Sequence, residues 1–261
     1  MMPLRLESDA SPLQNAYHMA RVAKAVYSDT PGAFRPEVAE AFPLLRTFRK
    51  GRTFGLVGAN ERHAVVAFRG TSGNNEWLEG LAYGQVDEPP GRVHGGLAEA
   101  LGGLWNELLA ALYDANALDK TLWLAGHSLG GSLAVLAARR LERQGYQPNA
   151  VFTFGAPTVL DADAAKSFSI PAWRFINNED AVPGLPWPVM FDSYRHVGER
   201  VHFLATGRIA ENRHSEGLAR KLDRADAIGM GPILAGPFHD HAMDRYIARL
   251  AAHAADPALQ S

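Results

Sequence analysis

The chain contains no cysteine among its 261 residues. This absence excludes disulfide bridges, zinc–thiolate sites, iron–sulfur clusters and a thiol nucleophile. The sequence also lacks an apolar run near the ~20 residues that a membrane-spanning helix needs. Residues 1–9 carry acidic side chains where a secretory leader would have an apolar stretch. We therefore expect a cytoplasmic location or export by a route without a signal peptide.

Neither sign of charge is in excess, because 26 Lys and Arg residues are balanced by 28 Asp and Glu residues, for a net charge of −2. Since nucleic-acid binders are usually basic, no nucleic-acid partner is expected. The length fits one large α/β domain. No repeat or linker divides the chain, so we expect residues 1–261 to form a single domain.

Short apolar runs alternate with amphipathic segments along the chain. The apolar runs predict strands at residues 54–58, 64–68, 121–125, 150–154, 173–177 and 201–204. Apolar residues at helical spacing predict helices at residues 13–27, 93–118, 129–144 and 242–251. This alternation favours a mostly parallel α/β sheet that helices cover on both faces.

One strand-to-helix turn has the pattern of a nucleophile elbow. Gly126, Ser128 and Gly130 form Gly-x-Ser-x-Gly between a predicted strand and a predicted helix. Small neighbours let the two elements approach, which lifts the serine hydroxyl clear of the sheet. The N–H of Leu129 would then point at a developing negative charge. The alternative is a glycine-rich turn with an incidental serine; a phosphate loop is excluded because no lysine follows the glycines.

A serine nucleophile needs an acid that orients its base, and with such an elbow the acid follows the serine in the chain. Asp180 comes just after the predicted strand at residues 173–177, where the acid is expected. Its rivals are four other carboxylates: Asp161, Asp163, Glu179 and Asp192. Any one of these residues is equally well explained as a solvated turn residue.

The histidine base should follow the acid, and six histidines do so. His239 and His241 come directly before the last predicted helix, from where a loop side chain can reach over the sheet. Position alone does not separate these two residues. No carboxylate–histidine spacing of a known metal motif surrounds them, so we expect no metal site.

Several short segments, taken together and in order, resemble the class 3 lipases, the fungal-type triacylglycerol lipase family. These segments are residues 65–71, 93–97, 126–131, 153–157, 177–183, 194–198 and 240–246. The resemblance extends from about Ala16 to Leu250. Leu97 stands where the family signature has phenylalanine, and the cysteines usual in the secreted fungal enzymes are absent. The missing cysteines, the lack of a visible signal peptide and the long segment at residues 207–237 favour a bacterial relative.

The resemblance implies an α/β-hydrolase fold and a serine hydrolase that needs no cofactor. It implies Ser128 as nucleophile, Asp180 as acid and His241 as base, and so separates His241 from His239. It also implies Thr71 and Leu129 as the two oxyanion-hole residues. The implied substrate is an acylglycerol or a related lipid ester. The alternatives are a short-chain or feruloyl-type esterase on the same scaffold and a non-catalytic lipase-like binding module.

Apolar segments near these residues suggest where an acyl chain would bind. Residues 72–83 correspond to the family's lid, and Trp77 and Leu81 could share its apolar face, although a packed amphipathic helix explains them equally well. Beyond Asp180, the apolar residues Val182, Leu185 and Trp187 would form an acyl-binding wall or a proline-stiffened packing loop.

The segment at residues 207–237 mixes basic and apolar residues. It suits a second cover over the site, a membrane-surface contact or a solvated loop.

The expected partners of the chain are a lipid ester substrate and, transiently, a lipid interface. The sequence predicts no oligomeric state.

Overall fold

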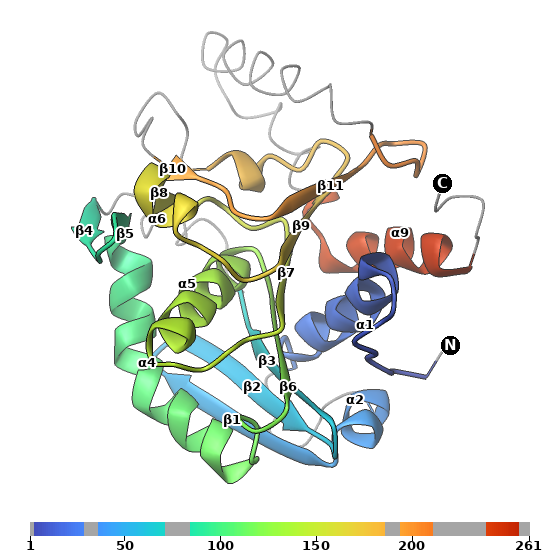
Figure 1. The fold of residues 1–261 in the computed structure, drawn as a ribbon. Helices are drawn as coiled ribbons and strands as arrows, with labels where there is room; N and C mark the ends of the chain where they lie inside the picture. The colour runs from blue at the N-terminus through green and yellow to red at the C-terminus, as the bar shows by residue number, and fades with distance from the viewer. Residues whose placement is uncertain (1–2, 29–35, 71–83, 186–193, 211–238, 256–261) are drawn as a thin grey trace, which may run out of the picture.

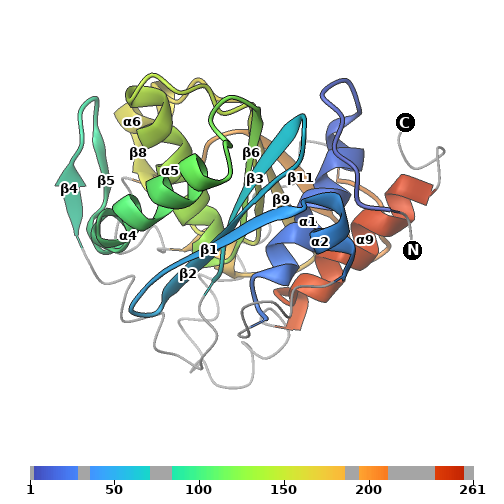
Figure 2. The ribbon, with the colours of Figure 1, turned by 90° about the horizontal axis from the view of Figure 1, so that it is seen from below.

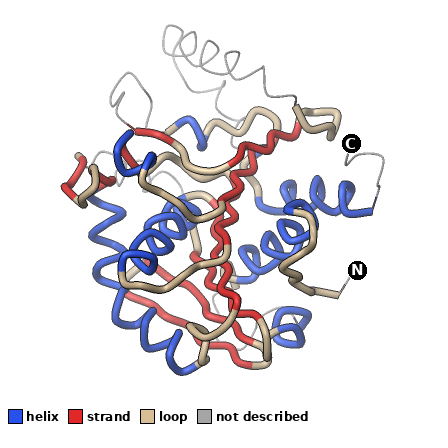
Figure 3. Tube along the Cα trace, in the orientation of Figure 1, coloured by secondary structure: helices blue, strands red, loops and turns tan. Residues whose placement is uncertain are grey.

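The computed structural model describes residues 3–28, 36–70, 84–185, 194–210 and 239–255. A seven-stranded sheet crosses the molecule in the order β1-β2-β3-β6-β7-β9-β11 (Figure 3). The strands from β3 to β11 run parallel, and β1 and β2 are added antiparallel at one edge. The strand bounds are β1 (Leu44–Lys50), β2 (Thr53–Ala59), β3 (His63–Phe68), β6 (Thr121–His127), β7 (Ala150–Phe154), β9 (Ala172–Asn177) and β11 (Glu199–Phe203).

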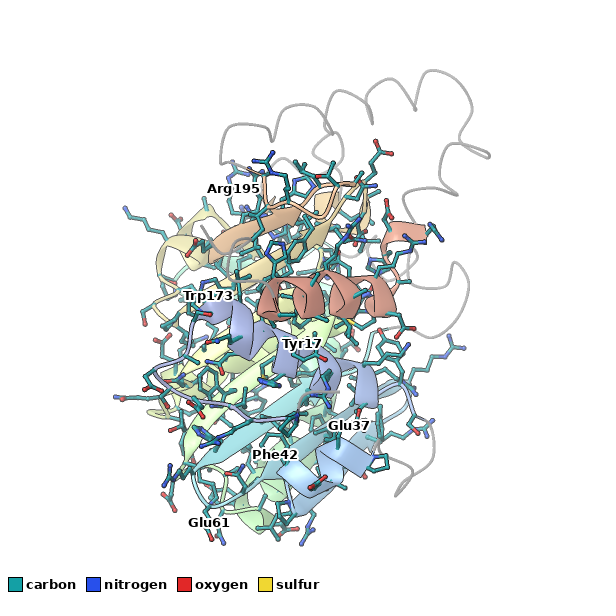
Figure 4. All side chains as sticks on the ribbon, turned by 90° about the vertical axis from the view of Figure 1, so that its right-hand side faces the viewer. Tyr17, Glu37, Phe42, Glu61, Trp173 and Arg195 are labelled. Carbon is teal, nitrogen blue, oxygen red and sulfur yellow. The ribbon has the colours of Figure 1, made fainter. Side chains whose placement is uncertain are left out.

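Helices cover both faces of this sheet (Figures 1 and 2). On one face lie α4 (Gly95–Asp114) and α5 (Leu129–Arg143), and on the other lie α1 (Pro12–Ala25) and α9 (Met243–Ala255). Figure 4 turns the second face toward the viewer, with Tyr17 on α1 beside α9. Each face of the sheet carries its own buried apolar cluster, so the sheet separates two hydrophobic cores.

The helix boundaries follow from local chemistry. Ser11 caps α1: its hydroxyl accepts a hydrogen bond from the N–H of Gln14, and the side-chain oxygen of Gln14 accepts one from the N–H of Ser11. The His94 side chain accepts a hydrogen bond from the N–H of Leu97 at the start of α4. Gly145, with φ of +89°, takes the left-handed conformation just after α5, where glycine commonly ends a helix.

The predicted strands and helices of the central sheet are confirmed, with small shifts of their ends. The helix predicted at residues 93–118 begins only at Gly95, because the residues before it pair as strand β5 (Arg92–His94). Strand β1 was not predicted, since Phe48 is its only buried residue. The short helix α2 (Pro36–Ala41) lies in a stretch where we expected none.

A second, four-stranded sheet was also missed. It consists of β4 (Gln85–Asp87), β5, β8 (Leu160–Asp161) and β10 (Tyr194–Arg195), in the order β10-β8-β5-β4, and it lies next to helix α6 (Ala162–Lys166). Strands of two or three residues are too short to show an alternating pattern. In the part of the chain that the structure describes, no helix is long and apolar enough to span a bilayer. The single-domain organisation stays a prediction.

Three loops leave the parallel strands at the same edge of the sheet, the edge where binding sites form in such folds. Backbone hydrogen bonds continue across this edge beyond the strands. The N–H of Ser128 donates to the carbonyl of Phe154 (2.9 Å), and that of Gly155 donates to the carbonyl of Phe175 (3.0 Å). The N–H of Asn178 donates to the carbonyl of Phe203 (2.6 Å). These three hydrogen bonds therefore fix the positions of the loops after β6, β7 and β9 relative to the neighbouring strands.

Candidate active site

Ser128 lies on a strained turn between β6 and α5. Its backbone has φ of 57° and ψ of −136°, a conformation that non-glycine residues rarely adopt. A Cβ on Gly126 would lie 2.1 Å from the carbonyl oxygen of Gly130, and one on Gly130 would lie 2.3 Å from that of Phe68. The two glycines are therefore required by the close approach of α5 to β6 and β3, as the elbow pattern predicts.

Asp180 lies in the loop after β9 and is fully buried. Both oxygens of its carboxylate accept hydrogen bonds. Oδ2 accepts hydrogen bonds from Nδ1–H of His241 (2.8 Å) and from the hydroxyl of Tyr246 (2.5 Å). Oδ1 accepts one from the N–H of Val182 (3.0 Å). A buried carboxylate is tolerated only when it is hydrogen-bonded in this way.

Tyr246 is the donor in its contact with Asp180. Burial, and then the negative charge of Asp180, raise the pKa of Tyr246 well above its usual value of 10. The phenol therefore stays protonated, and its oxygen also accepts a hydrogen bond from the N–H of Asn177 (3.2 Å). This arrangement places α9, which carries Tyr246, directly behind the acid.

The structure brings His241, and not His239, to the acid. The His241 side chain is 15% exposed, and its ring lies against Gly155, where an added Cβ would come within 2.9 Å of Cε1. His239 is exposed and contacts the guanidinium of Arg245. The geometry thus favours His241 as the base, although position in the sequence alone did not.

His127 fixes the backbone of His241. Burial, and then the nearby imidazole of His241, lower the pKa of His127 well below its usual value of 6.5, so His127 is neutral. Its Nε2–H donates to the carbonyl of His241 (2.7 Å), and its Nδ1 accepts from the hydroxyl of Tyr27 (2.7 Å). The two imidazole rings lie with centroids 4.4 Å apart. Since His127 precedes Ser128, this contact sets the base loop beside the elbow.

Gly70, two residues after the end of β3, lies beside Ser128. Its backbone hydrogen-bonds the hydroxyl of Tyr27. A Cβ on Gly70 would lie 2.9 Å from Cβ of Ser128 and 2.6 Å from the Tyr27 hydroxyl. The chain just before Thr71 therefore passes next to the serine. Thr71 itself lies outside the described residues.

Leu129 is the first residue of α5, and the N–H groups of a first helical turn have no acceptor within their helix. Its side chain packs against those of Val182 and Leu185, which are buried. The apolar loop after Asp180 thus reaches the elbow, and these two side chains are packed rather than exposed. Trp77, Leu81 and Trp187 lie outside the described residues, as do the lid segment at residues 72–83 and most of the segment at residues 207–237.

The competing acids have other partners or positions. Asp161 caps α6 by accepting a hydrogen bond from the N–H of Ala164 (2.8 Å) and lies 3.6 Å from Arg92. Glu179 is exposed, and Asp192 lies outside the described residues. Within the described ranges, no group of three or more His, Asp or Glu side chains could hold a metal ion.

Two other histidines that follow Asp180 also have local partners. Nε2–H of His196 donates to the carbonyl of Pro183 (2.8 Å), and Nε2–H of His202 donates to the carbonyl of Asn178 (2.8 Å). Burial, and then the positive charge of Arg174, lower the pKa of His196 to about 4. Together with the helix-capping His94, these residues act as framework rather than as rivals for the base.

Comparison with known proteins agrees with this geometry. Residues 65–190, which include the elbow and the acid loop, match the family described as lipase (class 3). Over this stretch the chain is similar to the class 3 lipases.

Two curated relatives show how far the similarity reaches. A lipase of Rhizomucor miehei is 34% identical over 154 residues, which is 54% of this chain and 42% of the relative. A secreted mono- and diacylglycerol lipase A of Penicillium camembertii is 32% identical over 158 residues, which is 56% of this chain and 50% of the relative. The chain therefore spans about half the length of the curated relatives it matches. Both are fungal, and a bacterial origin of this chain stays a prediction.

A solved lipase structure shares the fold. The triacylglyceride lipase of Rhizomucor miehei superimposes with a TM-score of 0.61 at 27% sequence identity, over 73% of this chain and 79% of the other. The α/β-hydrolase fold and the mostly parallel central sheet, both predicted from the sequence, are confirmed.

Several residues of this candidate site were not found from the sequence. Tyr246 was recognised only as one apolar position of the last helix, and Tyr27 only as part of the first. Gly155 was part of a motif without a role. Asp240 was seen only as the neighbour of His241. Nothing local to these residues signals their contacts, because each contact joins segments far apart in the chain.

Proposed function

We propose that this chain is a serine carboxylic-ester hydrolase of lipase type, acting on acylglycerols or related lipid esters through an acyl-enzyme. The observation that carries the proposal is the hydrogen bond from His241 to the buried Asp180, formed beside the strained turn of Ser128. The match to the class 3 lipase family over residues 65–190 and the names of the relatives support the same class of substrate.

In the proposed reaction, Oγ of Ser128 attacks the ester carbonyl carbon while Nε2 of His241 takes the hydroxyl proton. Asp180 holds the ring through Nδ1–H and stabilises the imidazolium that forms. The negative oxygen of the tetrahedral intermediate accepts a hydrogen bond from the N–H of Leu129, and Thr71 is proposed as the second donor.

The intermediate collapses when the bond from carbon to the alcohol oxygen breaks. Nε2–H of His241 protonates that oxygen, and the alcohol leaves an ester of the acyl group with Ser128. A water molecule then attacks this ester, with His241 taking its proton, and the collapse of the second intermediate returns the proton to Ser128 Oγ. The net reaction consumes one water and gives an alcohol and a carboxylic acid.

We further propose that the acyl chain binds on the side of Leu129, where Val182 and Leu185 form an apolar backing. Trp77, Leu81 and Trp187 are proposed to extend this surface. Such a wall favours substrates with an aliphatic acyl group, because pockets for apolar ligands are lined mainly by apolar side chains.

A chain-length series tests the proposal. Hydrolysis of p-nitrophenyl esters from acetate to palmitate, and of an acylglycerol emulsion, should show turnover of long-chain esters that is lost in Ser128→Ala. Activity confined to acetate and butyrate, or to feruloyl esters, would point to the esterase alternative. Absence of turnover on every ester by folded protein would point to a binding module.

A further inference from the structure

Asp240 is the residue directly before His241. It links the chain that carries His241 (the base loop) to the loop after β9 that carries Asp180 (the acid loop). Its Oδ2 accepts hydrogen bonds from the side-chain amide of Asn178 (2.7 Å) and from the N–H of Glu179 (3.3 Å). Its backbone carbonyl accepts a third from the side-chain amide of Asn177 (2.9 Å). Asp240 therefore forms a hydrogen bond with each of the three residues directly before Asp180, which are Asn177, Asn178 and Glu179.

The same segment is anchored on its other side by β11. Asn178 has φ of 47°, a left-handed conformation that asparagine tolerates better than most residues. Its N–H donates to the carbonyl of Phe203 (2.6 Å), and its carbonyl accepts from Nε2–H of His202. These bonds set the segment against the sheet, and Asp240 ties Asn178 and Glu179 to the residue directly before His241.

The chemistry of Asp240 fits this task better than simple packing. The residue is 8% exposed, and a buried carboxylate is unfavourable unless its oxygens are paired. Oδ2 is used by the two donors of the acid loop. Oδ1 lies 3.6 Å from a guanidinium nitrogen of Arg245, which supplies the opposite charge. An apolar side chain would fill the space without making any of these bonds.

We propose that Asp240 is a positioning residue that holds the acid and base loops at the separation where the Asp180 carboxylate meets the His241 imidazole. This inference rests on the proposed function, because the role it assigns is in that reaction. Loss of Asp240 lets the acid segment move away from the histidine. Proton transfer is then slowed, whereas binding of the ester is unaffected.

Asp240→Ala, Asp240→Asn and the control Asp244→Ala test this role. Asp244 is 70% exposed at its side chain and pairs with Lys24 (2.9 Å), so its removal deletes the same charge without touching the acid loop. Turnover of p-nitrophenyl butyrate is divided by the number of sites that a fluorescent phosphonate labels, so that only competent Ser128 is counted.

Asp240→Ala should lower kcat per labelled site about 10- to 100-fold, since a misplacement near 1 Å has a cost of this order. KM should stay within about twofold, as expected when an interaction made in the transition state is lost. Asp240→Asn should recover most of the loss, because its amide oxygen still accepts hydrogen bonds. Asp244→Ala should match the wild type.

A purely structural role predicts a different result, in which Asp240→Ala has fewer labelled sites but wild-type kcat at each of them. That result overturns the proposal, as does an Asp240→Asn variant no better than Asp240→Ala. If Asp240→Ala does not fold, Asn178→Gly removes the partner amide while still allowing the left-handed backbone, and it should lower kcat at unchanged KM. Wild-type protein that takes no phosphonate and cleaves no ester contradicts the proposed function instead.

Discussion

Gly155 is the position where the backbone comes closest to the Asp180–His241 pair, and substitution there tests the geometry of the site. A Cβ on Gly155 would lie 2.6 Å from Oδ2 of Asp180 and 2.8 Å from Nδ1 of His241. An ordinary contact begins at 3.4 Å, so Gly155→Ala requires the carboxylate to move by about 0.8 Å. A displacement of this size lowers turnover by about 100-fold.

Gly145→Ala is the matched control. Gly155 and Gly145 both have positive φ, at +59° and +89°, but a Cβ on Gly145 has no neighbour within 4 Å. Each alanine loses about 1–2 kcal/mol of stability to the left-handed conformation. Both variants should therefore lower Tm, whereas only Gly155→Ala should lower kcat.

The assay is turnover of p-nitrophenyl butyrate per phosphonate-labelled site, with Tm measured on the same samples. We expect kcat of Gly155→Ala to fall by about two orders of magnitude. Gly145→Ala should stay within about twofold of the wild type, because surface changes away from the site have small effects. A folded Gly155→Ala with wild-type kcat would refute the reasoning, since the acid and base would then not need their present positions.

Three further outcomes are expected. Tyr246→Phe removes a donor to Asp180 and should lower the free energy of unfolding by about 1–3 kcal/mol and kcat several-fold, as measured by urea unfolding and ester kinetics; no change in either contradicts this contact. The pKa of His196 is lowered from 6.5 to about 4, so the folded protein binds fewer protons than the unfolded chain between these values and loses stability as pH falls through this range. His196→Gln should make that loss shallower in urea unfolding at a series of pH values, and an unchanged slope contradicts the assignment. Leu185→Ala should reduce stability by about 2–3 kcal/mol and lower kcat/KM more for octanoate than for acetate esters, whereas an equal effect on both argues against the acyl wall.

The features predicted from the sequence are those whose physical cause is local. The strained turn at Ser128 needs glycine at Gly126 and Gly130 for steric reasons, so five consecutive residues carry the whole signal. The buried parallel strands are continuous apolar runs and were equally visible. Strand β1 was not, because an edge strand with one buried side chain has no clear apolar pattern.

The features that could not be predicted depend on contacts between distant segments. Asp180 and His241 are 61 residues apart, and before the family resemblance nothing in the spacing separated His241 from His239. The hydroxyl of Tyr246 donates a hydrogen bond to Asp180 because α9 packs behind the loop after β9. An amphipathic pattern shows that a tyrosine faces the core, but it does not show which atom its oxygen meets.

The central claim is that Ser128 carries the acyl group during turnover. Rapid acid quench of the protein during hydrolysis of p-nitrophenyl octanoate, followed by peptide mass spectrometry, tests it most directly. The account predicts an octanoyl adduct on the peptide containing Ser128, formed in a burst with p-nitrophenol release and absent from Ser128→Ala. Continued turnover by Ser128→Ala, or an adduct on another residue in the wild type, would contradict it.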